Sequence, residues 1–215
     1  CPDLDQSWAR RLFGELAAMS TVKPLIGHLD TARFDDPVIL KKLTLASRKL
    51  AELKGAALSI PRPGILINTL AMQEAKDSSA IENIVTTHDE VYREEGGAED
   101  GSSPAAKEVV RYREALRLGL DLIDREGLLT VRHILAVQEV IERNNAGFRR
   151  LPGTVLKDTL GNVVYTPPQS HDEIAGLMGD LEKVINDPDA LRLDPLLKMV
   201  VVHHQFESIH PFEDG

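Results

Sequence analysis

Apolar residues recur at helical spacing through most of this chain. The clearest run alternates steps of three and four residues, which places all of its members on one face of a helix; it consists of Leu43, Ala46, Leu50, Leu53 and Ala57. Asp36 and Pro37 come just before it, and this pair is typical of a helix N-cap followed by the first helical position. The pattern predicts an amphipathic helix that starts at Pro37 and is broken by the Pro-Arg-Pro-Gly sequence at 61–64.

The same period predicts further helices at residues 4–19, 65–76, 78–94, 104–124, 131–143, 171–186 and 195–210. Several of them begin at recognisable caps, namely Ser103, Thr130 and the capping-box pair Ser170 and Glu173. The chain is therefore predicted to be mostly helical.

The helical period disappears between Phe148 and Pro168. Residues that favour strands flank the polar turn at 158–162, and they are Val155, Leu156, Val163, Val164 and Tyr165. This arrangement predicts a β-hairpin that ends at Pro167 and Pro168. The predicted fold class is all-α, a helical bundle with one β-hairpin.

Composition agrees with such a bundle. Of the 215 residues, 42% are hydrophobic but only 4% are aromatic, so the core must be mostly aliphatic. Gly96–Ser103 is the best candidate linker, and we expect an N-terminal helical region over residues 1–100 and a core over residues 101–215. The net charge is −9 and no run of Lys or Arg occurs, which argues against a nucleic-acid surface.

The sequence also bears on location. Its single cysteine, Cys1, cannot form a disulfide within the chain and suits a reducing compartment. No apolar run approaches the length that spans a membrane, and the N-terminus does not resemble a signal peptide. We therefore expect a soluble cytoplasmic protein.

The candidate chemistry lies in the last thirteen residues, His203–Gly215. Pro211 ends the last helix directly after His210, so the imidazole is expected at a corner between helix and loop. Asp214 and Gly215 follow with a carboxylate and a backbone without Cβ. A base, a metal-binding carboxylate and a glycine turn within six residues indicate chemistry on phosphate. Taken singly, His210 would only offset the helix dipole and Asp214-Gly215 would be an ordinary turn.

The sequence His203-x-x-Phe206-Glu207-x-Ile209-His210-Pro211-Phe212-x-Asp214-Gly215 resembles the signature of the Fic family. In that family the motif continues with Asn-Gly-Arg and, two residues later, a second Arg. Phe148, Arg149 and Tyr165-x-Pro167-Pro168 also match the family pattern. Because the chain opens on Cys and stops inside this motif, we expect it to be a fragment of a longer protein.

The resemblance implies a Fic-type bundle and a protein adenylyltransferase, which moves AMP from ATP to a Ser, Thr or Tyr hydroxyl. It implies that His210 is the catalytic base and that Asp214 binds Mg²⁺. The implied nucleotide-binding residues are Glu82, His210, Pro211, Phe212, Glu213, Asp214 and Gly215. Glu213 itself is expected to face solvent, since the family leaves that position free.

A second motif, Ser78-x-x-x-Glu82-Asn83, resembles the inhibitory helix of self-restrained Fic proteins, here expected at about residues 78–94. The resemblance implies that Glu82 pairs with the second Arg of the longer motif and misplaces the ATP γ-phosphate. The spacing from Ser79 to Glu82 also fits a capping box at the start of this predicted helix. Both interpretations remain open.

The hairpin resembles the family's flap, which implies that its edge pairs with an extended target segment and aligns the target hydroxyl. The implied flap residues are Thr154, Val155, Leu156, Lys157, Val163, Val164 and Tyr165. Strand pairing tolerates many target sequences, so a neighbouring copy of the chain is also an implied target. An exposed hairpin is otherwise usually only a hairpin.

Two other functions remain as alternatives. Glu82 and His210 together would suit a deadenylylase or a bifunctional enzyme that removes AMP. A chain without the rest of the motif would be an inert binding module. Phe206 and Phe212 are expected to be core anchors, and His203 is expected to pack in the core or to support the site residues from behind, and not to be a ligand. The sequence contains no zinc pattern of Cys and His and no Walker loop.

Overall fold

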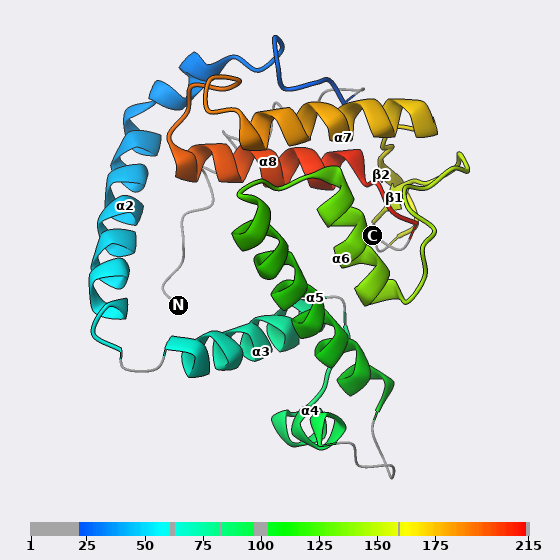
Figure 1. Cartoon of the computed structure of the whole chain (residues 1–215). Coiled ribbons are helices and arrows are strands. Elements are labelled where there is room, and N and C mark those ends of the chain that lie inside the picture. The colour runs from blue at the N-terminus through cyan, green and yellow to red at the C-terminus, as the bar shows by residue number, and fades with distance from the viewer. Residues whose placement is uncertain (1–21, 61–62, 82, 97–102, 159, 214–215) are drawn as a thin grey trace. The chain divides into compact units, whose positions relative to one another are not determined.

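The chain folds into helices with one small sheet, as its hydrophobic pattern predicts. The structure is a computed structural model and describes residues 22–60, 63–81, 83–96, 103–158 and 160–213. In chain order these residues form η1 (Thr31–Asp35), α2 (Pro37–Ala57), α3 (Pro63–Ile81), α4 (His88–Glu95), α5 (Pro104–Glu126), α6 (Val131–Glu142), β1 (Leu156–Lys157), β2 (Val163–Tyr165), α7 (His171–Asn186) and α8 (Pro195–Ile209) (Figure 1). The predicted helix at 4–19 lies outside the described residues.

These elements form two compact units. The first unit combines Cys1–Lys54 with Phe148–Gly215, and the second consists of Gly55–Gly147. The domain boundary predicted within Gly96–Ser103 falls largely on residues 97–102, which are not described. It stays a prediction.

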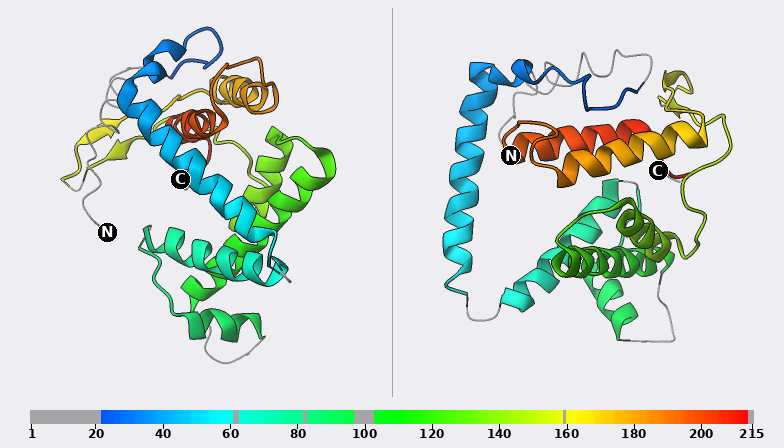
Figure 2. Two further views of the ribbon diagram at one scale, coloured as in Figure 1. Left: turned by 90° about the vertical axis from the view of Figure 1, so that its left-hand side faces the viewer. Right: turned by 45° about the horizontal axis from the view of Figure 1, so that its top comes forward.

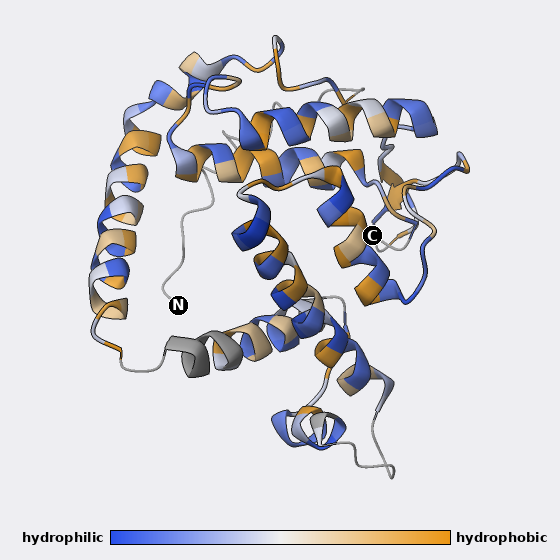
Figure 3. Cartoon of the chain, in the orientation of Figure 1, coloured by the Kyte–Doolittle hydropathy of each residue, from blue (hydrophilic) through white to orange (hydrophobic). Residues whose placement is uncertain are grey.

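Helices α7 and α8 form the core of the first unit. They lie side by side in every view (Figures 1 and 2). The buried face of α7 repeats at helical spacing, with Ile174, Leu177, Met178, Leu181 and Val184. By contrast, α2 carries apolar and polar residues along its whole length (Figure 3) and buries none of them. The last helix, α8, is therefore positioned mainly by α7 within this unit.

The hairpin of the first unit has the predicted strands and turn. Leu156 pairs with Tyr165 and Lys157 with Val163. The Asp158 carboxylate accepts hydrogen bonds from the backbone of Leu160 and Asn162, both at 2.9 Å. These bonds, and above all the one from the Asn162 side chain, hold the pKa of Asp158 below its usual value. The turn is thus fixed by one aspartate.

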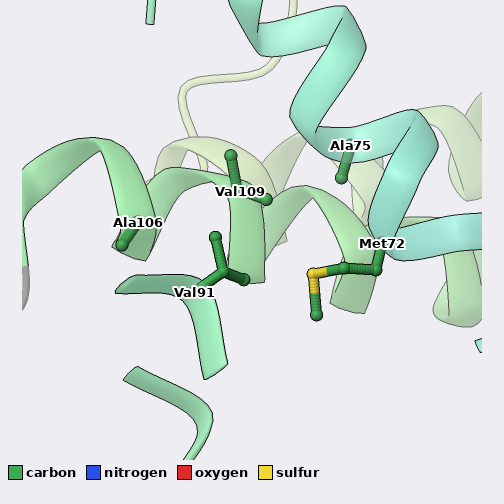
Figure 4. Close-up of a cluster of buried hydrophobic side chains, with 5 residues drawn as sticks. All are labelled: Met72, Ala75, Val91, Ala106 and Val109. Atoms are coloured by element: carbon green, nitrogen blue, oxygen red, sulfur yellow. The ribbon is translucent and has the colours of Figure 1, made fainter. Parts of the chain in front are cut away.

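The second unit packs around α5. Met72 and Ala75 of α3, Val91 of α4, and Ala106 and Val109 of α5 form a buried apolar cluster (Figure 4). The caps of α5 and α6 are those that the sequence predicts: the Ser103 hydroxyl accepts from the Ala106 N–H at 3.1 Å, and Thr130 accepts from the His133 N–H at 3.3 Å.

The single helix predicted at 78–94 is wrong, because the chain turns in the middle of it. Helix α3 ends at Ile81, and Asn83 adopts a left-handed backbone with φ of 64°. The Ile84 N–H donates to the Ser79 carbonyl at 2.9 Å and the Asn83 N–H to the Ala80 carbonyl at 3.2 Å. This is the Schellman pattern that closes a helix, and asparagine is one of the few residues that tolerate it.

The capping box predicted for Ser79 and Glu82 is therefore also wrong. Ser79 is buried near the end of α3, not at a helix start. The next helix, α4, begins at a different capping box, in which Thr87 and Glu90 bind each other's backbone N–H. Similarly, Ser170 stands at the N-cap of α7 but its side chain makes no capping hydrogen bond.

Candidate active site

His210 occupies the predicted corner at the end of α8. It is the C-cap residue, its N–H donates to the Phe206 carbonyl at 3.1 Å, and the side chain is partly buried. Its backbone is left-handed, with φ of 47° and ψ of 64°. Such a backbone costs roughly 1–2 kcal/mol for a residue with a Cβ, so surrounding contacts must hold it.

Arg149 supplies those contacts. The residue is only 2% exposed, and its Nε–H donates to the His210 carbonyl at 2.7 Å. One terminal nitrogen donates to the carbonyls of Pro168 and Ile209, and the Arg149 backbone N–H donates to the Pro211 carbonyl at 2.9 Å. Burial is the main cause that lowers the pKa of Arg149 from its usual value. Arg149 thus holds the backbone on both sides of the histidine, at Ile209 and His210 through its guanidinium and at Pro211 through its own backbone N–H.

Three aromatic rings pack around this corner. The rings of Phe148 and Phe212 lie 5.8 Å apart, and those of Phe206 and Phe212 lie 6.3 Å apart, both tilted. Phe148 is buried, but Phe206 and Phe212 are only partly buried. The expectation that Phe206 and Phe212 are core anchors is therefore only partly correct: they pack against other rings beside His210 but keep part of their surface exposed.

The surroundings favour the neutral form of His210. Burial lowers the pKa of its imidazole, and the charge of Arg149 lowers it further, whereas Glu207 raises it. The pKa of His204 is also lowered, first by burial and then by His203. A general base must be unprotonated before it acts, so a lowered pKa suits His210 to that role near neutral pH. His203 is exposed, so the expectation that it packs in the core is wrong, and its supporting role stays a prediction.

The hairpin contacts the same helix near its end. The Tyr165 hydroxyl donates to the Ser208 carbonyl at 2.7 Å, two residues before His210. Burial raises the pKa of this tyrosine. The neighbouring Val163 and Val164 are 55% and 64% exposed, so the hairpin offers apolar side chains to solvent.

A groove of about 380 Å³ lies beside the hairpin. Its lining includes Leu156, Val164 and Tyr165 from the hairpin and Glu207 and Ser208 from α8. The remaining wall comes from His204 and Gln205 of α8 and from residues 22–33, which precede α2. All of these residues belong to the first unit, so the hairpin and the last helix share one depression.

The structure brings several predicted site residues together. His210, Pro211, Phe212 and Glu213 are consecutive, and Glu213 is exposed as expected. The flap residues lie in the same unit. Glu82, Asp214 and Gly215 lie outside the described residues, while Ser78 and Asn83 belong to the second unit, where the Ser78 hydroxyl donates to Glu74 at 2.9 Å. The proposed meeting of Glu82 with the active site stays a prediction.

The metal prediction rests on Asp214. Among the described residues, no group of three or more His, Cys, Asp or Glu side chains is arranged to hold a metal ion. A magnesium ion that acts with nucleotide phosphates needs only one or two protein carboxylates, because phosphate oxygens and water complete its octahedron. The role of Asp214 therefore stays a prediction.

Sequence reasoning missed the main role of Arg149. The residue matches a family pattern beside the flap, but its bonds to the His210 and Pro211 backbone span about 60 residues and leave no local signal. The position of the arginine, directly before the hairpin, was the available clue. His171 adds a further contact, with its Nδ1 3.3 Å from the Arg149 carbonyl.

Comparison with known proteins gives two kinds of match. Residues 40–121 match a family model described as "Fic/DOC family N-terminal", and residues 128–215 match one described as "Fic/DOC family". No helix of the described residues combines the length and the apolar character that crossing a membrane requires.

A solved structure shares the fold. It is the crystal structure of a Fic family protein from Desulfovibrio desulfuricans G20, at 2.70 Å resolution, and the two chains superpose with a TM-score of 0.62 at 22% sequence identity. The match covers 83% of this chain and 53% of that one, so this chain spans about half the length of that relative.

Proposed function

Because this chain belongs to the Fic/DOC family, we propose that it is a nucleotidyltransferase that moves AMP from ATP to a Ser, Thr or Tyr hydroxyl of a protein. The observation that carries the proposal is the fixed corner at His210. Arg149 holds the backbone on both sides of an imidazole whose pKa is lowered, and a partly buried neutral histidine is what proton removal from a hydroxyl requires.

In the proposed reaction, the target hydroxyl oxygen forms a bond to the α-phosphorus of ATP. The bond from that phosphorus to the bridging oxygen of the β-phosphate breaks, and pyrophosphate leaves with the electron pair. The hydroxyl proton goes to the neutral imidazole of His210. A magnesium ion bound by Asp214 would supply positive charge beside the phosphates.

The hairpin is proposed to bind the target. Its strands are short, at two and three residues, and both are edges, so backbone groups are available for pairing with an extended segment. The hydrogen bond from Tyr165 to Ser208 fixes the hairpin base two residues from His210. A target segment paired there would carry its hydroxyl close to the base.

Glu82 is proposed to restrain the enzyme. It directly precedes Asn83, whose left-handed backbone closes α3. The proposal rests on the resemblance of Ser78-x-x-x-Glu82-Asn83 to the inhibitory motif of self-restrained Fic proteins. The reverse reaction, removal of AMP, would use the same Glu82 and His210.

A transfer assay tests the proposal. Full-length protein with ATP labelled at the α-phosphate should label protein, and His210→Ala should lower the rate at least 100-fold. His203→Ala is the matched control, since His203 is exposed on the same helix, and it should leave the rate within about twofold. Equal labelling by wild type and His210→Ala would refute the mechanism.

The variant Glu82→Gly separates restraint from reversal. If Glu82 only restrains transfer, the variant should label protein faster than wild type. If Glu82 also orients water for AMP removal, the variant should additionally lose the ability to strip AMP from a labelled target. No change in either rate would contradict both roles.

A further inference from the structure

The second unit contains a pocket that the proposed reaction does not use. It has a volume of about 650 Å³ and lies beside α5. Its charged lining consists of Lys107, Arg111, Arg113, Arg143, Glu94 and Glu114. All of these residues belong to Gly55–Gly147, whereas His210 and the hairpin belong to the other unit. We refer to it as the basic pocket.

Helix geometry explains why the cations gather there. Lys107 and Arg111 are four residues apart on α5, so they share one face of that helix. A short connection turns the chain after α5, with Gly127 in a left-handed backbone, and α6 packs back against α5. Arg143, which ends α6, is thereby returned to the same pocket.

Arg143 itself ends α6 in an unfavourable conformation. Its backbone is left-handed, with φ of 54° and ψ of 32°, a region that glycine and asparagine enter far more easily. Stability alone would favour glycine at this position. An arginine there, with its side chain lining a pocket, indicates that the side chain serves a purpose other than closing the helix.

Counted over the residues that the structure describes, the cations lining the basic pocket outnumber its acids by four to two, in a chain whose net charge is −9. No carboxylate of the described residues lies within ion-pair distance of Lys107, Arg111 or Arg143. The Nε of Arg111 is buried and has no hydrogen-bond partner among those residues. Arg111 and Arg113 are partly buried, whereas Lys107 and Arg143 are exposed. Like charges that line one pocket repel one another, and an anion bound between them would offset that repulsion.

We propose that the basic pocket binds the oligophosphate group of a small molecule. Arginine guanidinium groups match phosphate oxygens with paired N–H donors, and Arg111 and Arg143 provide such donors from α5 and the end of α6, with Lys107 adding a further cation. Only Pro104 and Val110 add apolar lining, so the pocket recognises the charged group and offers little to a large apolar one. The oligophosphate is either inorganic or part of a nucleotide.

Calorimetric titration of the full-length protein with sodium tripolyphosphate, in buffer without divalent cations, tests the proposal. Arg111→Gln and Arg143→Gly should each weaken binding at least tenfold. Arg143→Gly removes the cation and relieves the left-handed backbone, so it should fold at least as well as wild type. Arg117→Gln is the matched control, because Arg117 is exposed on α5 outside the pocket, and it should change the affinity less than twofold.

Comparison of ligands identifies the source. If tripolyphosphate and ATP bind with equal affinity and Arg111→Gln weakens both, the protein recognises the phosphates alone. If ATP binds more tightly and Arg111→Gln weakens it to the same extent, the ligand is a nucleotide. His210→Ala should leave tripolyphosphate binding unchanged while transfer is lost, which keeps this proposal separate from the proposed reaction. No binding by wild type, or equal weakening by Arg111→Gln and Arg117→Gln, would overturn it.

Discussion

Helices α3 and α8 each end on a residue with a left-handed backbone, and different contacts stabilise that backbone in each case. Both α8 and α3 close on a non-glycine residue with positive φ, His210 at 47° and Asn83 at 64°. At Asn83 the turn is closed by backbone hydrogen bonds to Ser79 and Ala80 in the same helix. At His210 it depends on Arg149, about 60 residues away in sequence. The first end is local in origin, whereas the second is imposed by tertiary structure.

The difference determines how each end responds to change. A local turn depends on the residue that occupies it, so substitution at Asn83 itself should matter most. A tertiary turn depends on its distant support, so the conformation at His210 should be most sensitive to Arg149. The position of the His210 side chain therefore depends on a residue far away in sequence as well as on its neighbours Phe206 and Pro211.

The largest effect is expected for Arg149→Met. This change keeps the length of the side chain but leaves the carbonyls of His210, Ile209 and Pro168 without their donor. Unfolding free energy of the first unit should fall by about 3 kcal/mol, since each buried polar group without a partner costs about 1–3 kcal/mol. Denaturant titration measures this, and transfer activity should be lost with it.

Arg150→Met is the control for that experiment, because Arg150 is adjacent and exposed. Its unfolding free energy should stay within about 0.5 kcal/mol of wild type. Comparable losses in the two variants would mean that Arg149 has no special role at the corner.

Substitution at Asn83 should give the next largest effect. Asn83→Gly should be more stable than Asn83→Ala by about 1 kcal/mol, because only glycine enters the left-handed region without cost. At Gln73, exposed inside α3, the order should reverse, with alanine more stable than glycine by about 1 kcal/mol. Denaturant titration of the four variants checks this, and the same order at both sites would contradict a left-handed turn at Asn83.

Tyr165→Phe tests whether the hairpin also supports the end of α8. Removing the hydroxyl leaves the Ser208 carbonyl without its 2.7 Å partner, and the unfolding free energy should fall by about 1 kcal/mol. Tyr92→Phe should have almost no effect, since Tyr92 is 56% exposed. If the two changes prove equivalent in thermal or denaturant unfolding, the hairpin does not stabilise this corner.

The smallest effect concerns pH. The pKa of His210 is lowered from 6.5, so kcat/KM of the full-length enzyme should fall only below pH 6.5, as the imidazole becomes protonated. Glu207 raises this pKa, so Glu207→Gln should move the acidic limb to still lower pH. Asp189→Asn removes the same charge from an exposed site of the same unit and should not move the limb. A shift of the limb to higher pH in Glu207→Gln would contradict the assignment.

The same shift has a consequence for stability. Because His210 has a lower pKa in the folded protein than in the unfolded chain, it contributes stability above the unfolded pKa, and this contribution is lost as pH falls through the folded pKa.

Much of the fold follows from local patterns in the sequence. The starts of α2, α5, α6 and α8 coincide with the predicted caps and prolines, and the hairpin turn coincides with Asp158 and its neighbours. These features depend on residues close to one another in the chain. The turn at Asn83 was missed because apolar residues continue at helical spacing across it, from Ile81 to Val91, so the period alone could not show that two helices meet there.

In the candidate site, too, the features that depend on neighbouring residues were predictable and those that depend on distant residues were not. The corner at His210 was predictable, because Pro211 follows it directly. Its support was not predictable, since the bonds of Arg149 and of Tyr165 to the end of α8 join segments far apart in sequence. The lowered pKa of His210 was not predictable either, because its causes, burial and the charge of Arg149, arise only in the folded structure.

Arg149 has one more property of interest, which concerns divergence between relatives. It stands just before the hairpin and also binds Pro168, just after it, so both ends of the hairpin are tied to the residue that positions His210, the proposed base. The tip between them is free of this constraint, and Leu160 there is 85% exposed. New side chains at the tip should therefore be tolerated, so that, if the hairpin binds targets as proposed, relatives could differ in target while the corner at His210 stays the same.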